Sequence, residues 1–300
     1  NVLATVIGIF VFMMLSFFGI ILIGVIFGGD SETVEVENNS VIELNLSDIS
    51  DDYAGKYSDP WVTAFSERKK IGLTDVINAI EIAETDDAIK GISILNTNSS
   101  LGMAQSKELR DALNRFKKSG KFIYSYANNY SQKEYYLNSV ATSIYINPIG
   151  ELDFKGLSTE VMFFKDFQEK SGLKMEVIRH GKYKSAVEPF LENKMSDANK
   201  EQTMALLNGI WTNIVEDISK SRNIPVEKLN TIANGLLART PEMAKAQNLI
   251  DYIAYEDVYH NAIRKLLKVD KDEDYNTVSI ADYTQKTTTT SVNMDSNDAI

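Results

Sequence analysis

The stretch that decides the fold is Ile89 to Tyr126, which has the sequence IKGISILNTNSSLGMAQSKELRDALNRFKKSGKFIYSY. Residues 89–95 and 122–126 are short runs rich in β-branched and aromatic residues, which predicts two strands. Between them, residues 104–119 carry apolar side chains at helical spacing and are followed by Gly120, a common helix terminator. A strand, a helix and a second strand in this order predict a βαβ unit with parallel strands.

The same alternation continues on both sides of this unit. Upstream we expect a strand at 41–46 and a helix at 74–83 that begins at Thr74. Downstream the predicted elements are a helix at 132–140, a strand at 143–146, a helix at 160–170, a strand at 175–178, a helix at 197–221 capped by Ser196, and helices at 226–234 and 256–268. The pattern predicts an α/β fold with a mainly parallel sheet and C-terminal helices.

The first 29 residues carry no charge, although the chain has 31 Lys and Arg and 42 Asp and Glu. Residues 2–29 are interrupted by only two hydroxyl side chains, Thr5 and Ser16. As a helix this segment would be about 42 Å long, which exceeds the roughly 30 Å hydrocarbon core of a bilayer. A cleaved signal peptide has a shorter apolar core of about 7 to 15 residues and ends in small residues. We therefore expect an uncleaved transmembrane anchor rather than a cleaved signal peptide or a buried core helix.

Charge near the anchor and the polarity of the tail predict the domain organisation. The acidic stretch 30–39 has no Lys or Arg to hold this end in the cytoplasm, so we expect the bulk of the chain to be extracytoplasmic. Four segments result: the anchor at 1–29, a linker with the first strand at 30–72, the α/β domain at 73–268, and a polar linker at 269–300. We expect that last linker to lead to a further domain.

Composition argues against several kinds of site. The net charge is −11 and no basic stripe is present, so a nucleic-acid partner is not expected. The absence of Cys excludes disulfides, thiolate zinc sites, Fe–S clusters and a Cys nucleophile, and two His placed 80 residues apart cannot form an HExxH site. The glycine-rich loops that bind nucleotide phosphates are also absent. We therefore expect neither a metal nor a cofactor.

One loop and two histidines are weaker candidates. Loop 96–103 follows a predicted strand at the edge where open α/β sheets bind ligands, but its one glycine, Gly102, makes it a poor oxyanion hole. We interpret it as an ordinary loop. A Ser-His-Asp triad would have to use His180 or His260. We expect His260, in a predicted amphipathic helix, to lie at a surface or interface, and His180 to make a structural hydrogen bond.

Segment 179–190, RHGKYKSAVEPF, contains a candidate base of another kind, Lys184. A lysine acts as general base for a serine only when it is neutral, so its usual pKa of about 10.4 must be lowered by burial or by neighbouring cations. Arg179 and Lys182 supply positive charge beside Lys184. The apolar residues that could surround it are Tyr183, Val187, Pro189 and Phe190. From composition alone, however, a lysine in a loop is expected to be solvated.

Residues 183–190, YKSAVEPF, together with 129–132 (NYSQ) and 135–137 (YYL), resemble the amino-terminal half of the signal peptide peptidase A family in its long, two-repeat bacterial form. The resemblance covers nearly the whole chain. It implies a serine protease of the ClpP/crotonase-like fold, anchored in the bacterial inner membrane with its bulk on the periplasmic side, which cuts remnant signal peptides and assembles as a ring-like homotetramer. It also implies a Ser/Lys dyad in which the first repeat supplies the base, at the position of Lys184, and the second repeat supplies the serine.

The first repeat departs from the nucleophile motif of the family. Where the second repeat would carry Ser-Gly-Gly-Tyr, residues 131–135 have SQKEY. Gln132 lies nearest the position of the nucleophile, so we interpret Ser131 as a structural serine. Lys133 and Glu134 replace small residues that let a substrate approach. The resemblance therefore implies that the nucleophile lies in a second repeat after residue 300 and that this chain alone is inactive.

Two other functions stay open. One is a membrane-anchored extracytoplasmic scaffold or binding module that has kept the fold and lost catalysis. The other is a crotonase-like acyl-thioester enzyme, which only the fold favours and which the anchor and the missing glycine-rich loop disfavour. A Ser-Gly-Gly motif after residue 300 would favour the protease.

Overall fold

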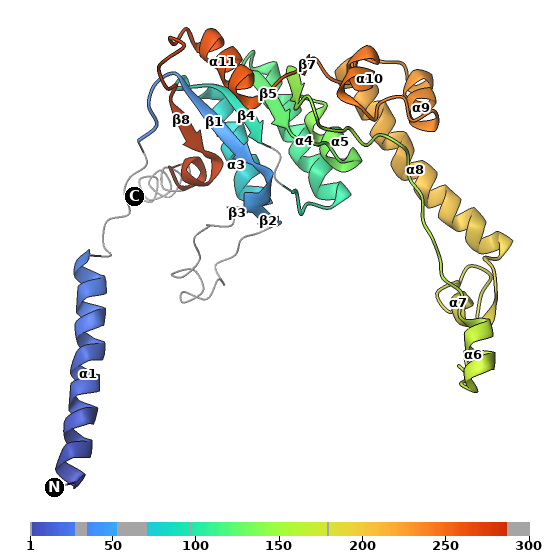
Figure 1. Cartoon of the computed structure of the whole chain (residues 1–300), viewed down its shortest axis with the longest axis horizontal. Helices are drawn as coiled ribbons and strands as arrows, with labels where there is room; N and C mark the ends of the chain where they lie inside the picture. The colour runs from blue at the N-terminus through green and yellow to red at the C-terminus, as the bar shows by residue number, and fades with distance from the viewer. Residues whose placement is uncertain (1, 28–34, 53–70, 96–97, 179, 287–300) are drawn as a thin grey trace, which may run out of the picture. The chain divides into compact units, whose positions relative to one another are not determined.

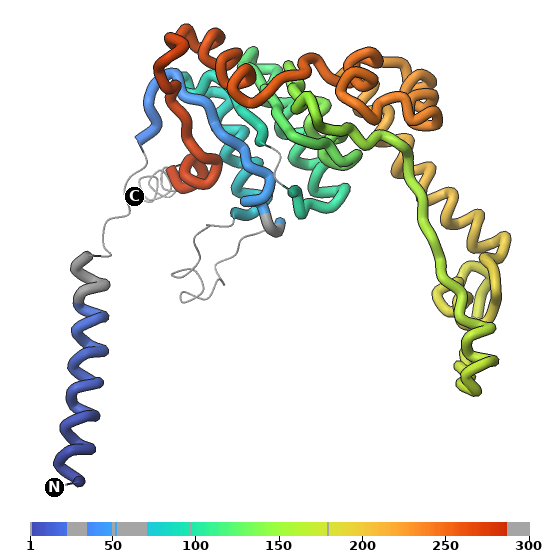
Figure 2. Tube along the Cα trace, in the orientation of Figure 1, coloured from blue at the N-terminus to red at the C-terminus, as the bar shows by residue number. Residues whose placement is uncertain are grey.

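A computed structural model describes residues 2–27, 35–52, 71–95, 98–178 and 180–286 (Figures 1 and 2). The chain divides into two compact units, residues 1–36 with 285–300 and residues 37–284. In the first unit, helix α1 (Val2–Phe27) confirms the predicted apolar helix. Its segment Val2–Leu22 is long and apolar enough to cross a membrane, a test that a signal sequence near the N-terminus also passes.

The second unit is built on a six-stranded sheet with the strand order β7-β6-β5-β4-β1-β8. Every pair of neighbouring strands in it is parallel, which confirms the predicted α/β fold. The strands are β1 (Ser40–Asn45), β4 (Ile89–Leu95), β5 (Phe122–Ala127), β6 (Ser143–Ile146), β7 (Tyr252–Ile253) and β8 (Thr277–Ser279). A separate two-stranded sheet pairs β2 (Ile49–Asp51) with β3 (Ile71–Gly72), and a short 3-10 helix, η1 (Leu46–Asp48), joins β1 to β2.

Different helices cover the two faces of the large sheet, because side chains alternate along a strand. On one face, Tyr126 and Tyr145 pack around Tyr259 of α11 (Glu256–Leu267), with ring centroids 5.4 and 5.2 Å from that of Tyr259. Ile144, next to Tyr145 in β6, and Ile123, three positions before Tyr126 in β5, are fully buried toward the other face. Figure 1 shows α3 (Leu73–Thr85) and α4 (Met103–Lys118) on that side of the sheet.

The crossover helices follow from amphipathic spacing and from their terminators. Helix α4 buries Leu109, Ala112, Leu113 and Phe116, which repeat at the spacing of one helix face. It ends at Gly120, whose φ of +86° is a left-handed conformation that glycine adopts without strain. Helix α5 (Gln132–Asn138) follows β5 and is capped by Ser131. The loops that lead into α4 and α5 begin at the carboxyl ends of the neighbouring strands β4 and β5, so both loops lie at the same edge of the sheet.

A long arm, residues 157–213, extends from this sheet domain. It contains α6 (Lys165–Ser171), α7 (Glu188–Leu191) and the first part of α8 (Asp197–Arg222). Among the described residues of the arm only Glu188 is buried. The last third of α8, beyond the arm, has three buried side chains, Ile214, Val215 and Ile218. Figures 1 and 2 show α6 and α7 at the end of α8 that lies away from α9 (Val226–Asn234) and α10 (Pro241–Ala246). We call the buried end of α8, from Ile214 onward, the root of the arm, and the region around α6 and α7 its tip. The arm is therefore packed at its root and largely exposed at its tip.

The strand predicted at 175–178 is wrong, because residues 173–178 have no regular secondary structure. Ile178 is fully exposed, at 104% of its reference accessibility. A strand needs a neighbour to pair with its N–H and C=O groups, and none lies beside this segment in the described part of the arm. The helix predicted at 160–170 begins later, as α6.

Part of the predicted polar linker at 269–300 belongs to the sheet domain instead. Strand β8 pairs with β1, where Val278 lies opposite Ile42, and residues 280–286 are helical. Val278, Ile280 and Tyr283 are buried. These few apolar side chains are separated by polar residues, so the average composition conceals them. Residues 287–300 lie outside the described residues, as does the path toward any further domain.

Candidate active site

Ser131, Gln132, Lys133 and Glu134 lie at the beginning of α5, facing the loop 98–102 that follows β4. We call these four residues and that loop the α5 junction. Ser131 is the N-cap: its Oγ accepts a hydrogen bond from the N–H of Glu134 at 3.3 Å, and its own N–H donates to Glu134 Oε2 at 3.0 Å. This reciprocal capping satisfies two N–H groups at the start of the helix. Ser131 therefore has the structural role that the sequence predicts for it.

Gln132, which the resemblance predicts to lie nearest the nucleophile position, has its side-chain amide hydrogen-bonded to a neighbouring backbone segment. Its Oε1 accepts hydrogen bonds from the N–H groups of Lys155 and Gly156, both at 2.9 Å. Its Nε2 donates to the carbonyl of Gly156, also at 2.9 Å. The side-chain amide thus pairs with this segment as the peptide group of an adjacent strand would. It continues the parallel bridge between Tyr130 and Leu152.

The loop opposite α5 is tied down in the same way. Lys133 Nζ donates to the carbonyls of Ser99 and Leu101 at 3.0 and 2.5 Å. The N–H of Ser99 donates to Glu134 Oε1 at 3.4 Å, and that of Gly102 donates to Gln105 Oε1 at 2.7 Å. The N–H groups of Ser99 and Gly102 are therefore bonded to side chains instead of being open to an oxyanion. Asn96 and Thr97, the first residues of the predicted loop, lie outside the described residues.

Lys184 is presented differently, at the tip of the arm. It lies in an exposed turn where its N–H donates to the carbonyl of Gly181 at 3.3 Å. Its ammonium group has no hydrogen-bond or ion-pair partner among the described residues. Tyr183 is expected to be one of the apolar residues around Lys184, but it is 47% exposed. Its ring instead contacts Lys182, whose Nζ lies 5.0 Å from the ring centroid. The apolar surroundings suggested by the sequence are therefore not assembled around Lys184 by the described chain, and Arg179 lies outside it.

The turn that carries Lys184 is nevertheless fastened to folded structure. Glu188 is 2% exposed, and its Oε2 accepts a hydrogen bond from Asn199 Nδ2, in the first turn of α8, at 2.6 Å. Phe190 stacks on Phe164 with centroids 5.8 Å apart, and the N–H of Phe164 donates to the carbonyl of Pro189 at 2.7 Å. No hydrogen bond or ion pair between described residues joins 180–187 to the α5 junction. The two candidate centres are therefore separate.

Comparison with known proteins relates this chain to one protein family. The family model described as Peptidase family S49 matches residues 115–270. This range contains residues 131–134 of the α5 junction and the whole arm. The chain belongs to peptidase family S49. It is 36% identical over 220 residues to "Protease 4" of Haemophilus influenzae, which covers 70% of this chain and 35% of that protein.

Two further relatives agree with this assignment. "Protease 4" of Salmonella typhi is 33% identical over 225 residues, and "Serine protease SPPA, chloroplastic" of Arabidopsis thaliana is 30% identical over 248 residues. These matches cover 72% and 83% of this chain, but 36% and 35% of the relatives. The chain thus spans about a third of the length of the S49 relatives that it matches.

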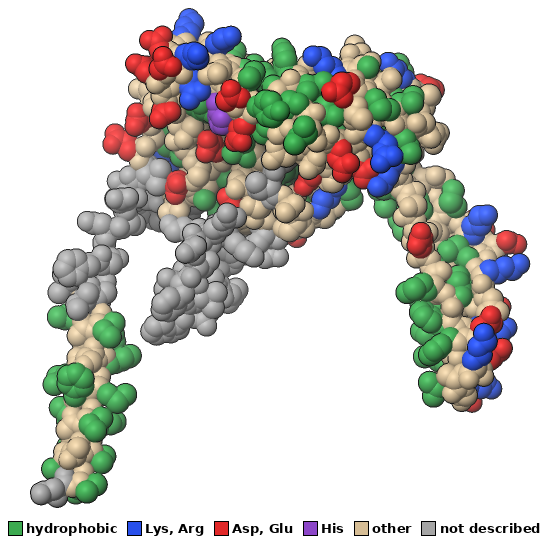
Figure 3. All heavy atoms as spheres, in the orientation of Figure 1, with side chains coloured by type: hydrophobic (Ala, Val, Ile, Leu, Met, Phe, Trp, Pro, Cys, Tyr) green, Lys and Arg blue, Asp and Glu red, His purple; other side chains and the backbone are tan. Residues whose placement is uncertain are grey.

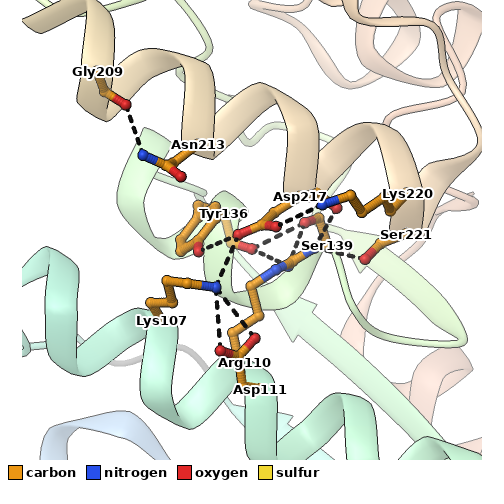
Figure 4. A network of polar contacts seen from close by, with 10 residues as sticks. All are labelled: Lys107, Arg110, Asp111, Tyr136, Ser139, Gly209, Asn213, Asp217, Lys220 and Ser221. Atoms are coloured by element: carbon orange, nitrogen blue, oxygen red, sulfur yellow. Dashed lines mark hydrogen bonds and ion pairs between the residues drawn. The ribbon is translucent and has the colours of Figure 1, made fainter.

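A polar network at the root of the S49 arm was not predicted from the sequence (Figure 4). Arg110, on α4 and 1% exposed, donates through NH1 to the carbonyl of Tyr136 and, at 2.7 Å, to Ser139 Oγ. Its NH2 donates to the carbonyl of Asp217 at 2.8 Å and to Ser221 Oγ at 2.6 Å, both on α8. The hydroxyl of Tyr136 donates to Asp217 Oδ2 at 2.9 Å. One buried guanidinium thus joins α4, α5 and α8.

The network also shifts the acidity of its members. Burial lowers the pKa of Arg110 and raises the pKa of Tyr136. Burial alone would raise the pKa of Asp217, but the hydrogen bond from Tyr136 and the charges of Lys107 and Arg110 outweigh it and lower that pKa overall. Asp217 therefore stays ionised and faces Lys107 Nζ at 3.4 Å. The one sequence signal was an arginine on the helix face that also presents Ser106 and Leu113.

Neither histidine makes a hydrogen bond or ion pair with Lys184 or with the α5 junction among the described residues, although His180 lies in the same arm segment as Lys184. His260 Nδ1 is 2.7 Å from the hydroxyl of Tyr275, and its Nε2 is 3.6 Å from Glu256 Oε1. It holds the segment before β8 against α11 and is half-buried, which agrees with the surface or interface position predicted for it. His180 is exposed in the arm and makes no hydrogen bond with other described residues, so its predicted structural hydrogen bond is not found.

Replacing Lys133 with alanine should destabilise the α5 junction. The carbonyls of Ser99 and Leu101 would lose a charged donor, which costs about 1.5–3 kcal/mol in the free energy of unfolding. Lys155→Ala is the matched control, because the described contact of the Lys155 side chain is an exposed ion pair with Asp153, worth about 0–1 kcal/mol, and its backbone hydrogen bond to Gln132 is kept in the variant. Denaturant unfolding of the chain in detergent micelles checks both values. Equal losses for the two variants would contradict a structural role for Lys133.

Proposed function

We propose that this chain is the part of a membrane-anchored S49 serine endopeptidase that supplies the lysine general base, Lys184. The observation that carries the proposal is that Lys184 stands exposed on a fastened arm, while the nucleophile position of the same repeat is closed by Gln132. An exposed base with no open serine site in its own repeat is expected if the serine of the dyad comes from a different repeat. The second repeat of the same polypeptide, following this chain, would supply the serine and the dry surroundings that a neutral lysine needs.

The proposed mechanism uses Lys184 twice. Its neutral Nζ takes the proton from the serine hydroxyl as the serine oxygen attacks the carbonyl carbon of the scissile peptide bond. Lys184 then returns that proton to the nitrogen of the leaving amine as the C–N bond breaks, which leaves an acyl-enzyme. Lys184 then takes a proton from a water molecule as the water oxygen attacks the ester carbonyl carbon. It returns that proton to the serine oxygen as the ester C–O bond breaks, which releases the second product and restores the serine. The proposed substrates are cleaved signal peptides.

The proposed setting is a membrane surface with the sheet domain on the extracytoplasmic side. Helix α1 supports an anchor through its length and apolarity. The arm supports assembly, because Figure 3 shows hydrophobic side chains along one side of it and charged side chains along the other. Its most exposed apolar residues are Met162, Phe167, Leu173, Ile178 and Leu206. Such a surface is typical of a protein interface, and we propose a homotetramer in which arms contact neighbouring repeats.

A scaffold that has lost catalysis is the second candidate. The closed α5 junction favours it, since the repeat contained in this chain has side chains in place of an open nucleophile and oxyanion site. It would keep the arm as an assembly surface and need no serine elsewhere. The two candidates differ in whether the complete polypeptide contains a reactive serine.

Labelling with a fluorophosphonate, which reacts with activated serines, distinguishes the two. We expect the complete polypeptide to be labelled at a single serine after residue 300, and the 300-residue chain alone to remain unlabelled. Mass spectrometry of the labelled peptide gives the position, and Ser131→Ala in the complete polypeptide serves as the control that should label normally. Absence of any label would favour the scaffold, and a label on Ser131 would refute the closed junction.

A further inference from the structure

The arm is packed against the sheet domain over a short part of α8 and is exposed over most of its length, so a small rotation of α8 at the packed end displaces the exposed end. In α8, Ile214, Val215 and Ile218 are buried, whereas the residues before them are exposed or half-buried. An α-helix rises about 1.5 Å per residue, so Asn199, which fastens the Lys184 turn, lies about 27 Å along α8 from Asp217. By the same estimate, a rotation of about 5° at the root moves the tip by about 2 Å.

Apolar packing at the root leaves this rotation poorly determined, because such contacts are not directional. Hydrogen bonds depend on angle, and the root has a set of them that comes from two different helices. Arg110 reaches the backbone of Asp217 and the hydroxyl of Ser221 from α4, and Tyr136 reaches the carboxylate of Asp217 from α5 (Figure 4). Lys107 adds a second contact to the same carboxylate, with its Nζ 3.4 Å from Asp217 Oδ2.

We propose that Arg110, Tyr136 and Asp217 are positioning residues that set the angle of the arm and thereby the location of Lys184. The inference rests on the proposed function, in which Lys184 is the base. None of the three touches the reacting atoms, and each acts through α8. Arg110 also binds the carbonyl of Tyr136 and the hydroxyl of Ser139, at the end of α5. The network therefore fixes the orientation of the arm relative to the sheet domain of the same repeat.

Tyr136→Phe tests this with minimal disturbance, since it removes one hydroxyl and one hydrogen bond. A misplacement of about 1 Å can cost about 100-fold in rate, so we expect kcat of the complete polypeptide for a signal-peptide substrate to fall at least about 10-fold. KM should change less than about 2-fold, because a misplaced base weakens only the transition state. Asp217→Asn should act in the same direction.

The matched control is Tyr283→Phe. Tyr283 is also a buried tyrosine whose hydroxyl donates to a carboxylate, Asp86 Oδ2 at 3.0 Å, but it follows β8 and this hydrogen bond leads to the end of α3 instead of to α8. Its kcat should stay within about 2-fold of the unsubstituted enzyme, even if both variants lose similar stability. A shared loss of kcat would indicate a merely structural effect and overturn the inference.

A distance measurement follows the arm directly. The chain has no cysteine, so Glu201→Cys on the exposed part of α8 and Lys118→Cys at the end of α4 give two specific spin-label sites. Dilution with unlabelled chain restricts electron-electron dipolar spectroscopy to pairs within one molecule. We expect Tyr136→Phe, and not Tyr283→Phe, to shift or broaden the distance distribution.

The outcomes separate the inference from the function it rests on. If Lys184→Ala keeps full activity, the proposed base is wrong whatever the arm does. If Lys184→Ala is inactive and Tyr136→Phe keeps both its kcat and its distance distribution, the positioning role is overturned and the base stands. A distance change without loss of kcat, or a loss of kcat without a distance change, also overturns it.

Discussion

Lys184→Ala in the complete polypeptide should lower kcat for peptide hydrolysis by about 10³-fold or more. General base catalysis contributes about 10²–10⁴-fold, and a nucleophile that loses its base also loses the acid for the second proton transfer. Lys184→Arg should be equally inactive, because a guanidinium stays protonated and cannot accept the serine proton. KM should change little, since Lys184 acts on the transition state. Hydrolysis of a fluorogenic signal-peptide substrate measures both constants.

Lys182→Ala is the control for this experiment. It removes a lysine from the same exposed turn, two residues away, and the described contacts that it loses are those with the ring and the hydroxyl of Tyr183. We expect kcat to remain within about 2-fold, because Lys182 takes part in neither of the proposed proton transfers. If Lys184→Ala retained activity comparable to Lys182→Ala, Lys184 would not be the base.

Arg110→Met should be the most destabilising single change at the root of the arm. It leaves the carbonyls of Tyr136 and Asp217 and the hydroxyls of Ser139 and Ser221 without their donor. Breaking such a buried charged network costs about 3–5 kcal/mol in the free energy of unfolding. Methionine keeps much of the side-chain volume, so the loss reports mainly the missing hydrogen bonds. Denaturant unfolding of the chain in micelles measures it.

Arg115→Met provides the comparison on the same helix. Arg115 makes an exposed ion pair with Glu81 at 2.7 Å, with about half of each side chain accessible to solvent. Such pairs contribute about 0–1 kcal/mol, and the loss should fall in that range. Losses of similar size at the two positions would mean that the Arg110 network contributes no more than a surface pair.

Much of the sheet domain could be predicted from periodicity alone. The βαβ unit of residues 89–126 is confirmed because each strand is buried on both faces and each crossover helix has one clear apolar face. The cap of α8 at Ser196 is also confirmed, since its side chain accepts from the N–H of Asn199 at 3.2 Å. Local chemistry decides these features, so the local sequence is sufficient to find them.

The misses arise where structure depends on distant or absent partners. Residues 175–178 alternate as a strand does, but pairing is a property of two segments, and no second segment lies beside them in the described arm. Strand β8 has one buried apolar side chain, Val278, and exists because β1 offers it an edge. In both cases the intrinsic preference of the segment was outweighed by the presence or absence of a neighbour.

The candidate site divides along the same line. Ser131 could be identified as a structural residue from its sequence neighbours, because capping is local. Lys184 came from a family resemblance, and the dry surroundings inferred for it are not supplied by the described residues. The Arg110 network escaped notice because its partners lie 26 to 111 positions away in the sequence. A buried arginine is recognisable only when its partners are known.

The two ends of the large sheet bear on how copies of this domain behave in concentrated solution. Its outermost strands, β7 and β8, have only two and three residues. Long bare edges act as templates for strand addition and lead to aggregation, and short edge strands remove most of that template. The sheet is therefore a poor seed for fibrils or domain swapping, and self-recognition is left to side chains, which can be specific about the partner they accept.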